Sequence, residues 1–463
     1  MPDLIAAIAT PPGPGGVGIL RLSGPGAHQA ASQVFHPQGP LPLDQAPDRQ
    51  LLYGALRDPA GDLLDTGLAF ISRAPHSYTG EDTAELQCHG SPVVLSLALE
   101  ALYAAGARPA RPGEFTQRAF LNGKLDLTQA EAVIDLIDAE TPAAARQAAG
   151  QLGGALSQRV DGIYQGLTDI MAHFCAVLDY PDEDIDPFRI QQLQADLDAQ
   201  QAALADLLAT GRRGQRLVKG VSCALIGRPN AGKSSLLNAL AGYDRAIVTH
   251  IPGTTRDTIE VTVELGGFPF RLVDTAGLRE SEDPIERMGA QRSRQAMDQA
   301  DLLLVVWDGT QPPSEEEQSL LAQALDRTDT VLAVNKADLS GYTLPTLTLP
   351  DAPHTLTTVA LSAKTGQGLD RLEDALAALA EAAFPLAGQT AAGQLLTNQR
   401  QTDAVRRALA AVERAGQALA AGVTPDALLT DVEEALSALG ELTGRTVRED
   451  ITQRIFERFC VGK

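Results

Sequence analysis

Hydrophobic residues follow different patterns in successive parts of this chain, and each pattern predicts a different kind of structure. Up to about residue 118, short strand-like runs (GVGILRLSG, LDTGLAFISR and DTAELQCHG) alternate with turn residues, and one helical stretch covers 93–105. This mixture predicts a small α+β domain.

From Leu127 onward, apolar residues recur at steps of three and four, the period of an amphipathic helix. The first such stripe predicts one helix that ends in the acidic segment DYPDEDIDP; its members are Leu152, Leu156, Val160, Ile163, Leu167, Ile170, Phe174 and Val177. The second consists of Ile190, Leu193, Leu197, Leu204 and Leu207. Similar stripes return near the C-terminus, at Val405, Leu409, Val412 and Leu419 and at Leu429, Val432, Leu436 and Leu439.

The segment between these helical parts alternates strand-like runs (VSCALIG, FRLVDTAG, DLLLVVWDG and TVLAVNKAD) with helical ones, which predicts a doubly wound, mostly parallel sheet. The C-terminal helical part, about 75 residues, would bury a poor core alone. We therefore expect one discontinuous helical domain, with two separate helical modules as the alternative. The predicted boundaries are 1–118 for the N-terminal domain, 119–215 and 386–463 for the helical domain, and 216–385 for the inserted domain.

Composition narrows the functional class of this 463-residue chain. No apolar stretch reaches the ~20 residues needed to span a bilayer. The four cysteines, Cys88, Cys175, Cys223 and Cys460, form no CxxC pair, which argues against zinc or disulfides and favours the cytoplasm. A net charge of −22 argues against bulk attraction to nucleic acid, although a local basic patch or a partner protein could still bind it.

The segment GRPNAGKS, residues 227–234, matches the phosphate-binding loop G-x-x-x-x-G-K-[ST] and lies between a strand-like and a helical run. Glycines let the N–H groups of such a loop surround phosphate oxygens at the positive end of a helix. We expect Lys233 to reach the β- and γ-phosphates and the Ser234 hydroxyl to bind Mg²⁺.

Further GTPase segments follow in order. Thr255 in GTTRD is expected to bind Mg²⁺ and sense the γ-phosphate, and Asp274 in DTAG to hold a metal-bound water. The Asp338 carboxylate in NKAD can accept hydrogen bonds from two guanine donors that adenine lacks, which selects GTP. The predicted GTP-binding residues are Asn230, Ala231, Gly232, Lys233, Ser234, Ser235, Thr255, Asp274, Thr275, Ala276, Gly277, Asn335, Lys336, Asp338, Ser362, Ala363 and Lys364.

Leu278 follows DTAG at the position where Ras-type GTPases carry a glutamine that orients the attacking water. Leucine has no polar atom, so another group must position the water. The nearest candidates are the acids Glu280, Glu282, Asp283 and Glu286. The side-chain oxygen of Asn230, with backbone carbonyls of 249–254, could coordinate a monovalent cation in the place of an arginine finger.

These segments, with FCVGK at the C-terminus and TPPGPGGVGILRLSG, YTGEDTAELQCHG and RPGEFTQRAFLNGKLDLTQAEAV near the N-terminus, resemble the MnmE (TrmE) family of tRNA modification GTPases over essentially the whole chain. The resemblance implies a folate-binding N-terminal domain that dimerises, a helical domain, and a P-loop GTPase domain inserted into it. It also implies a homodimer that works with the flavoprotein MnmG (GidA) in a heterotetramer or larger complex.

The implied reaction adds a (carboxymethyl)aminomethyl group to C5 of the tRNA wobble uridine. The one-carbon unit comes from a tetrahydrofolate derivative, 5-formyl- or 5,10-methylene-tetrahydrofolate. The tRNA is expected to be contacted largely through the partner.

The resemblance also assigns residues. A K⁺ ion replaces the arginine finger, and its ligands fall at Asn230, Thr249, Ile251 and Thr254; Thr249 and Thr254 thereby join the GTP-binding set. Glu286 falls at the water-orienting glutamate, so the expected catalytic residues are Glu286, Asn230 and Lys233. Folate contacts fall at Arg21, Glu85, Lys124 and Lys463.

Three positions near these sites need comment. Pro252 stands in the cation loop where a small residue is expected, and it removes one N–H. Val461 replaces the usual isoleucine of the terminal motif. Cys460 is either a reactive thiol in the modification chemistry or a buried structural residue, and burial is the commoner fate.

Two rival functions remain open. A GTP-dependent switch for ribosome assembly or membrane binding shares the GTPase segments, but such proteins usually carry a basic RNA-binding module, and this acidic chain has none that is obvious. A folate-binding scaffold with a decayed GTPase is the other; the intact phosphate loop, Thr255, Asp274 and Asp338 argue against it.

Overall fold

The computed structural model describes residues 3–179, 187–242, 246–247, 259–274, 297–345, 353–385, 391–423, 425–446, 455–457 and 459–462. The chain forms two compact units. The first comprises Met1–Ile134 and Leu439–Lys463, and the second comprises Asp135–Ala438. The four domain boundaries that the sequence suggests remain predictions.

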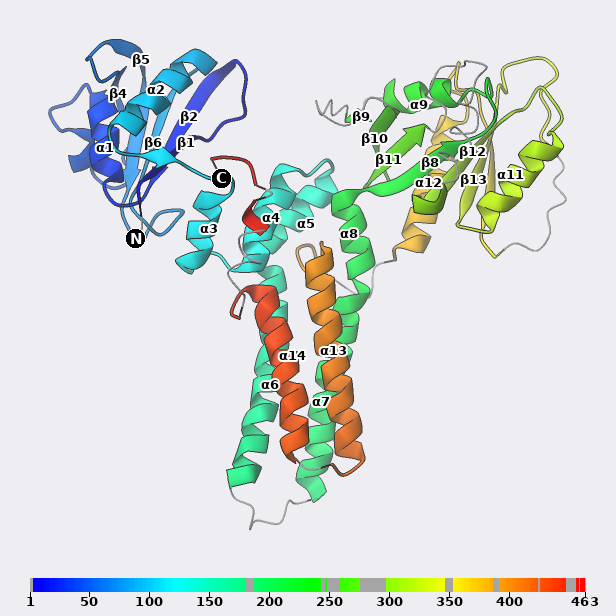
Figure 1. Ribbon diagram of the computed structural model, residues 1–463. Helices are drawn as coiled ribbons and strands as arrows, with labels where there is room; N and C mark the ends of the chain where they lie inside the picture. Colours follow the sequence, from blue (N-terminus) through cyan, green and yellow to red (C-terminus); the bar gives the residue numbers. More distant parts are fainter. Residues whose placement is uncertain are drawn as a thin grey trace, which may run out of the picture. The chain divides into compact units, whose positions relative to one another are not determined.

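The first unit contains a seven-stranded sheet in the order β3-β4-β5-β6-β2-β1-β7 (Figure 1). Its strands are β1 (Ile5–Ile8), β2 (Gly15–Ser23), β3 (Phe35–Pro37), β4 (Leu52–Arg57), β5 (Leu63–Ser72), β6 (Thr83–Gly90) and β7 (Arg108–Pro109). Helices α1 (Ala27–Val34) and α2 (Pro92–Ala104) pack against each other and against the sheet. The strands and the helix expected from the sequence are confirmed here.

Strand alternation separates the core of this sheet from a polar face. Leu20, Leu22 and Leu86 belong to the buried cluster that contains α1 and α2. Because successive side chains of a strand point to opposite faces, Arg21 and Glu85 lie on the face away from those helices. The two residues are direct partners in the β2–β6 ladder.

The C-terminal segment packs within the first unit, beside α3 (Glu114–Leu121). Phe456 and Phe459 are buried there, and the ring centroids of Phe120 and Phe456 are 6.3 Å apart. Gly113, at φ +66°, precedes α3, and a Cβ on it would lie 2.6 Å from the carbonyl oxygen of Phe456. The chain's two ends therefore share one core.

The helical part comprises α4 (Leu127–Ile137), α5 (Pro142–Leu152), α6 (Ala155–Asp179), α7 (Pro187–Ala209), α8 (Gly211–Lys219), α13 (Gln399–Ala420) and α14 (Pro425–Thr443). Helix α13 packs along α7 (Figure 1), which supports one discontinuous helical domain over two separate modules. Alanines at 404, 408, 411 and 415 are buried on α13, so it can approach its neighbour closely.

Two details of the predicted helices are wrong. The stripe that starts at Leu152 belongs to two helices, because α5 ends at Leu152 and α6 begins at Ala155. Gly154 lies between them with φ +89°, a conformation that breaks a helix. Ile190 was expected in the buried stripe but is 41% exposed.

The inserted domain is a second seven-stranded sheet in the order β14-β13-β12-β8-β11-β10-β9. Its strands are β8 (Val221–Ile226), β9 (Ala246–Ile247), β10 (Ile259–Leu265), β11 (Phe268–Asp274), β12 (Leu302–Asp308), β13 (Thr330–Asn335) and β14 (Leu356–Ala360). Pairing is parallel from β14 to β11, whereas β10 and β9 pair antiparallel. The predicted mostly parallel sheet is confirmed.

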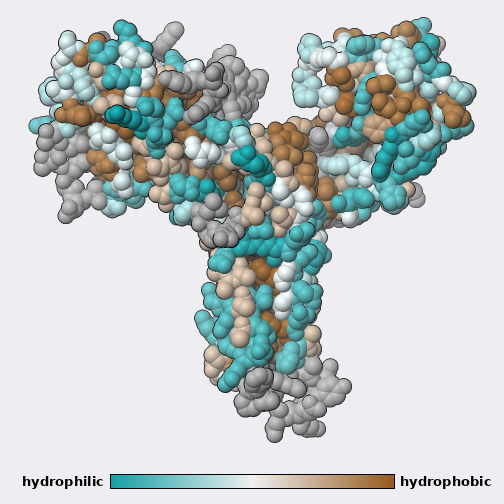
Figure 2. Space-filling view, turned by 180° about the vertical axis from the view of Figure 1, so that it is seen from behind, coloured by the Kyte–Doolittle hydropathy of each residue, from teal (hydrophilic) through white to brown (hydrophobic). Residues whose placement is uncertain are grey.

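Helices cover both faces of this sheet. Leucines of α9 (Lys233–Gly242) and α12 (Leu369–Ala383) belong to one buried cluster, and leucines of α11 (Glu315–Leu325) to another. The sheet is therefore doubly wound. Figure 2 shows that the long helices present a mainly hydrophilic surface, with hydrophobic residues visible in a narrow strip. None of the described helices is long and apolar enough to cross a membrane.

Candidate nucleotide site and N-terminal pocket

The phosphate-binding loop connects β8 to α9 and depends on two glycines. Gly227 has φ +148°, and a Cβ there would lie 2.3 Å from the carbonyl oxygen of Val306. Gly232 has φ +99°, and a Cβ there would lie 2.1 Å from Nδ2 of Asn335. Asn230 also adopts a left-handed conformation, with φ +63°. The spacing of the motif thus corresponds to backbone angles that the loop needs.

Lys233 lies inside this loop and is 5% exposed. Its Nζ donates hydrogen bonds to the carbonyl oxygens of Gly227 at 2.7 Å and Arg228 at 2.9 Å. Burial lowers the pKa of Lys233, while the negative charge of Asp274 opposes that change. A buried cation whose described hydrogen-bond acceptors are neutral carbonyls attracts an anionic phosphate strongly.

Ser234 and Asp274 meet beside the loop. Ser234 Oγ donates to Asp274 Oδ2 at 3.0 Å. Asp274 is 1% exposed at the end of β11, which pairs with β8 in parallel, so both residues lie at the same edge of the sheet. A hydroxyl and a carboxylate at this spacing supply oxygen ligands of the kind that Mg²⁺ prefers. The residues present therefore fit the predicted metal.

Asn335 connects the phosphate loop to the loops expected to bind guanine. Its side chain is buried at the end of β13, where Nδ2 donates to the Ala231 carbonyl at 2.9 Å. Its Oδ1 accepts from the N–H groups of Lys336 at 2.8 Å and Ala363 at 3.0 Å. One amide side chain thus holds three predicted segments together.

The residues expected to read the base lie next to this amide. Ser362 is fully buried and donates from Oγ to Asp338 Oδ1 at 2.7 Å. This bond orients the Asp338 carboxylate that would accept the two guanine donors. Lys364, the last predicted base-loop residue, is exposed.

One residue of this site was missed by the sequence reasoning. Asp308 ends β12 and pairs through Oδ2 with Lys336 Nζ at 2.5 Å. Burial works to raise the pKa of Asp308, but hydrogen bonds from Lys336 and Thr310 lower it overall. An acid that ends an apolar strand of a parallel sheet was the available signal, since neighbouring parallel strands end at the same edge.

Several predicted residues lie outside the described part of the chain. They are Thr249, Ile251, Pro252, Thr254, Thr255, Thr275, Ala276, Gly277, Leu278, Glu286 and Lys463. Of the predicted K⁺ ligands, only Asn230 is described, and it is exposed. The expectations for K⁺ coordination and for the water-orienting acid therefore remain predictions.

The first unit contains a cavity of about 550 Å³ on the polar face of its sheet. Two predicted folate contacts, Glu85 and Lys124, line it together with the aromatic rings of Phe70 and Tyr78. The volume falls within the ~300–1,000 Å³ of small-molecule sites. A lining of aromatic rings, one acid and two cations fits a conjugated ligand with carboxylates.

Arg21, the third described residue of the predicted folate contacts, lies outside the lining and meets the C-terminal segment beside Glu85. Arg21 Nε pairs with Glu85 Oε1 at 2.8 Å, and Arg21 Nη1 donates to the carbonyl oxygen of Gly462 at 3.3 Å. The guanidinium also lies 5.7 Å from the ring centroid of Tyr78. Cys460 is exposed, so the alternative of a buried thiol is wrong.

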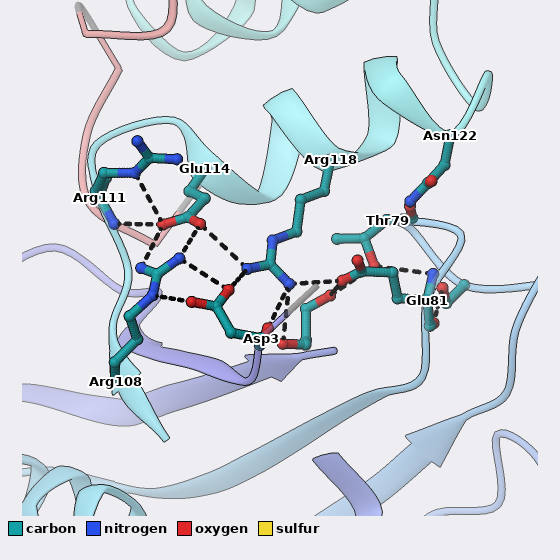
Figure 3. Close-up of polar contacts among 10 residues, drawn as sticks. Asp3, Thr79, Glu81, Arg108, Arg111, Glu114, Arg118 and Asn122 are labelled. Carbon is teal, nitrogen blue, oxygen red and sulfur yellow. Dashed lines mark hydrogen bonds and ion pairs between the residues drawn. The ribbon is translucent and has the colours of Figure 1, made fainter. Parts of the chain in front are cut away.

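A charged network holds the connection between β5 and β6 that borders the cavity (Figure 3). Arg118 donates to Glu81 Oε2 at 2.9 Å, to Asp3 Oδ1 at 2.8 Å and to Glu114 Oε1 at 3.1 Å. Asn122 Nδ2 donates to the Thr79 carbonyl at 2.7 Å. Helix α3 is thereby tied to the connection.

Glu114 is the buried centre of this network, with a side chain that is 3% exposed. Arg108 donates to both of its oxygens, at 2.6 and 2.9 Å. Burial alone would raise the pKa of Glu114, but the hydrogen bonds from Arg108, Arg111 and Arg118 lower it to about 2. The carboxylate therefore stays ionised over the whole physiological range.

Comparisons with known proteins cover the entire chain. A family model for the MnmE helical domain matches residues 127–460, and a model for the GTP-binding protein TrmE N-terminus matches residues 4–124. A structure described as the G domain of the T. maritima FeoB iron transporter matches 35% of this chain and 98% of its own, at 26% identity and a TM-score of 0.25. That likeness is too weak to carry a conclusion.

Full-length relatives are much more similar. The tRNA modification GTPase MnmE of Roseiflexus castenholzii is 46% identical over 474 residues, covering 100% of this chain and 99% of the relative. The proteins of the same name from Chloroflexus aurantiacus and Thermus thermophilus are each 44% identical over 100% of this chain, and cover 100% and 99% of the relatives. The chain therefore belongs to the MnmE (TrmE) family of GTPases.

Proposed function

We propose that this chain is a GTPase of tRNA modification that adds a (carboxymethyl)aminomethyl group to C5 of the wobble uridine. It acts with the flavoprotein MnmG and takes the one-carbon unit from a tetrahydrofolate derivative. Relatives named tRNA modification GTPase MnmE, at 44–46% identity over the full chain, support the activity. The bridging position of Asn335, between the phosphate loop and the base loops, is the single structural observation that carries GTP binding.

Each described residue of the nucleotide site has a role in this proposal. Lys233 exchanges its two carbonyl partners for the β- and γ-phosphates, a better match for a buried cation. Ser234 would bind Mg²⁺ and Asp274 would hold a water on it, with Thr255 proposed as a further ligand. Mg²⁺ neutralises phosphate charge when bound. The Asp338 carboxylate, oriented by Ser362, selects guanine.

In this proposal, a K⁺ ion takes the place of the arginine finger, and an acid takes the place of the water-orienting glutamine. Asn230, Thr249, Ile251 and Thr254 are the proposed K⁺ ligands, and Glu286 orients the attacking water. The exposed position of Asn230 at the mouth of the phosphate loop supports its part in such a site. Pairing of two G domains in a homodimer would shield that cation from solvent.

The N-terminal pocket is the proposed site for the folate derivative. Glu85, held by Arg21, can accept hydrogen bonds from the amide and amino N–H groups of a pterin, much as Asp338 does for guanine. Phe70 and Tyr78 offer aromatic surfaces, and Lys124 and Lys463 supply positive charge. Transfer to tRNA involves MnmG, which we expect to supply most of the tRNA contact for so acidic a chain.

The cation hypothesis is tested by GTP hydrolysis of the full chain in KCl and in NaCl at equal ionic strength. Because a K⁺ ion takes the place of an arginine finger, we expect hydrolysis at least about tenfold faster in KCl. Asn230→Gly should remove this acceleration. Glycine accepts φ +63° without strain, so this variant removes the side-chain oxygen and keeps the loop conformation.

Binding of a fluorescent GDP analogue provides the control, because Asn230→Gly should still bind nucleotide. Equal rates in both salts would exclude the K⁺ site. Retained acceleration in Asn230→Gly would exclude Asn230 as a ligand and leave the GTPase assignment intact.

A further inference from the structure

Two cations that line the N-terminal pocket have poorly matched partners. Arg49 Nη2 donates to the carbonyl oxygen of His76, and Lys124 Nζ donates to the carbonyl oxygen of Pro75 at 3.1 Å. Both acceptors are neutral and belong to consecutive residues. Among the described lining residues, Glu85 is the acid, and it is already paired with Arg21 at 2.8 Å.

Among the described residues, Asp48 is a further charged neighbour of Arg49. Its Nε lies 3.7 Å from Asp48 Oδ2, and the two side chains are 59% and 39% exposed. An exposed pair at this distance contributes little. Asp48 Oδ1 also accepts a hydrogen bond from the Arg73 N–H at 2.7 Å, so its position serves the backbone. The guanidinium of Arg49 is free to exchange these weak contacts for a better one.

The backbone of Arg49 is unusual. Its φ is +58°, the left-handed region that arginine rarely occupies, and its N–H donates to the Ile71 carbonyl at 2.8 Å. Glycine or asparagine would adopt this conformation at lower cost. Strained residues of this kind concentrate at ligand sites. Arginine stands at this position despite the strained backbone, which indicates that its long cationic side chain has a role.

The register of the sheet separates these cations from Glu85 along the pocket. Glu85 pairs with Phe70 inside the β5–β6 ladder, and the ladder's last pair is Ser72 with Thr83. Pro75 and His76, which accept from the two cations, lie in the connection beyond that pair. The pocket thus has an acid inside the ladder, aromatic rings beside it, and two cations toward the connection.

We propose that Arg49 and Lys124 bind the carboxylates of the ligand's glutamate tail, with Arg49 as a binding residue that determines specificity for that tail. This inference rests on the proposed function, in which the pocket takes a tetrahydrofolate derivative. The order of groups in the pocket matches that ligand: a donor edge on the pterin for Glu85, an aromatic centre, and a dicarboxylate at the far end. Arginine suits a carboxylate because its planar fork can donate two parallel hydrogen bonds.

The test measures calorimetric binding of two ligands to the full chain. One is 5-formyltetrahydrofolate, which carries one glutamate, and the other is 5-formyltetrahydropteroate, which has no glutamate. Arg49→Asn removes the charge with a residue that tolerates φ +58°. We expect it to weaken binding of the glutamate-bearing ligand about fivefold and to leave the pteroate unchanged.

Arg57→Gln is the matched control. Arg57 ends β4 outside the pocket lining and donates to the Gly61 carbonyl at 2.7 Å, so it removes the same charge from the same unit. It should leave both affinities unchanged, which excludes a general electrostatic effect.

Equal weakening of both ligands by Arg49→Asn, or no weakening of either, would overturn the proposal while leaving folate binding established. A wild-type chain that binds neither ligand would overturn the folate site itself, and with it this inference. A triglutamate form of the ligand gives a further check. Arg49→Asn should weaken its binding at least as much as it weakens binding of the monoglutamate.

Discussion

The nucleotide site and the N-terminal pocket differ in how far apart their residues lie along the chain. In the phosphate loop, Lys233 bonds to a carbonyl only six residues away. Beside the pocket, Arg21 bonds to a carbonyl 441 residues away, and the lining comes from the segment before β4, from β5, β6 and their connection, and from the segment after α3. The phosphate loop is largely a local backbone motif, whereas the pocket is assembled from segments that lie far apart in the first unit.

This difference explains what each site needs from the sequence. The phosphate loop requires glycine where φ is positive and lysine at one fixed spacing, so a short pattern identifies it. The pocket depends on the register of the β5–β6 ladder and on a connection held by a charged network, neither of which a short pattern contains. In the phosphate loop, substitutions should therefore weaken nucleotide binding mainly by disturbing the backbone conformation. At the pocket, substitutions of side chains that do not line it should also matter.

The largest effect should come from Gly232→Ala. A methyl group at this position would meet Asn335 Nδ2 at 2.1 Å on a backbone with φ +99°, so it would displace the amide that joins the phosphate and base loops. Strain and the lost hydrogen bonds together amount to about 3 kcal/mol, or more than 100-fold in affinity. Titration of a fluorescent GDP analogue measures the loss.

Gly242→Ala serves as the control, because a Cβ at Gly242 meets no described atom within 4 Å. Its affinity should equal that of the wild type. Near-normal binding by Gly232→Ala would mean that the backbone geometry of the loop is not what defines this site.

The next largest effect concerns Glu114, the buried centre of the charged network beside the pocket. The pKa of Glu114 is lowered from 4.5 to about 2 in the folded chain. A lowered pKa stabilises the folded state above pH 4.5, and this contribution is lost as the pH falls from 4.5 toward 2. The full contribution is about 3 kcal/mol, of which about 2 kcal/mol is lost by pH 3. Glu114→Gln should abolish this share of the pH dependence.

Urea unfolding at pH 6 and pH 3 measures this share, with pulsed hydrogen exchange and mass spectrometry of the segment 114–121 as the readout. Glu100→Gln, an exposed glutamate on α2, should retain the wild-type pH dependence. GTP binding by Glu114→Gln at pH 7 should stay normal, because the network lies in the other unit. If Glu114→Gln kept the wild-type dependence of unfolding on pH, the ionised Glu114 carboxylate would not be what stabilises the network beside the pocket.

Much of the fold could be predicted from hydrophobic periodicity alone. The doubly wound sheet, three strands of the first sheet (β2, β5 and β6) and the long helices follow from patterns of period two or three to four. The break between α5 and α6 could not, because the apolar stripe continues across it and only the conformation of Gly154 separates the helices. Periodicity reports which face is buried, and it is insensitive to a turn that preserves that face.

The candidate sites were predictable to different degrees for the same physical reason. The phosphate loop, Asp274 and Asp338 follow from local motifs at strand ends. Arg21, Glu85 and Lys124 came from family resemblance, because nothing local shows that Glu85 and Lys124 line one cavity or that Arg21 pairs with Glu85. Arg49 could not be found at all from the sequence, since its interest comes from its conformation and from carbonyls that folding brings to it.

The smallest effect tests a tertiary ion pair of the nucleotide site, the pair between Asp308 and Lys336. Asp308 ends β12 and Lys336 directly follows the neighbouring strand β13, and their side chains are 18% and 31% exposed. Because the pair is partly exposed, Asp308→Asn should weaken GTP binding only about twofold to fivefold. The lowered pKa of Asp308 keeps it ionised at neutral pH, so this loss should be constant between pH 6 and pH 8. Asp326→Asn, beyond the end of α11, should have no effect. A loss as large as that of Gly232→Ala would mean that tertiary contacts define both sites equally, and the contrast between a local and an assembled site would disappear.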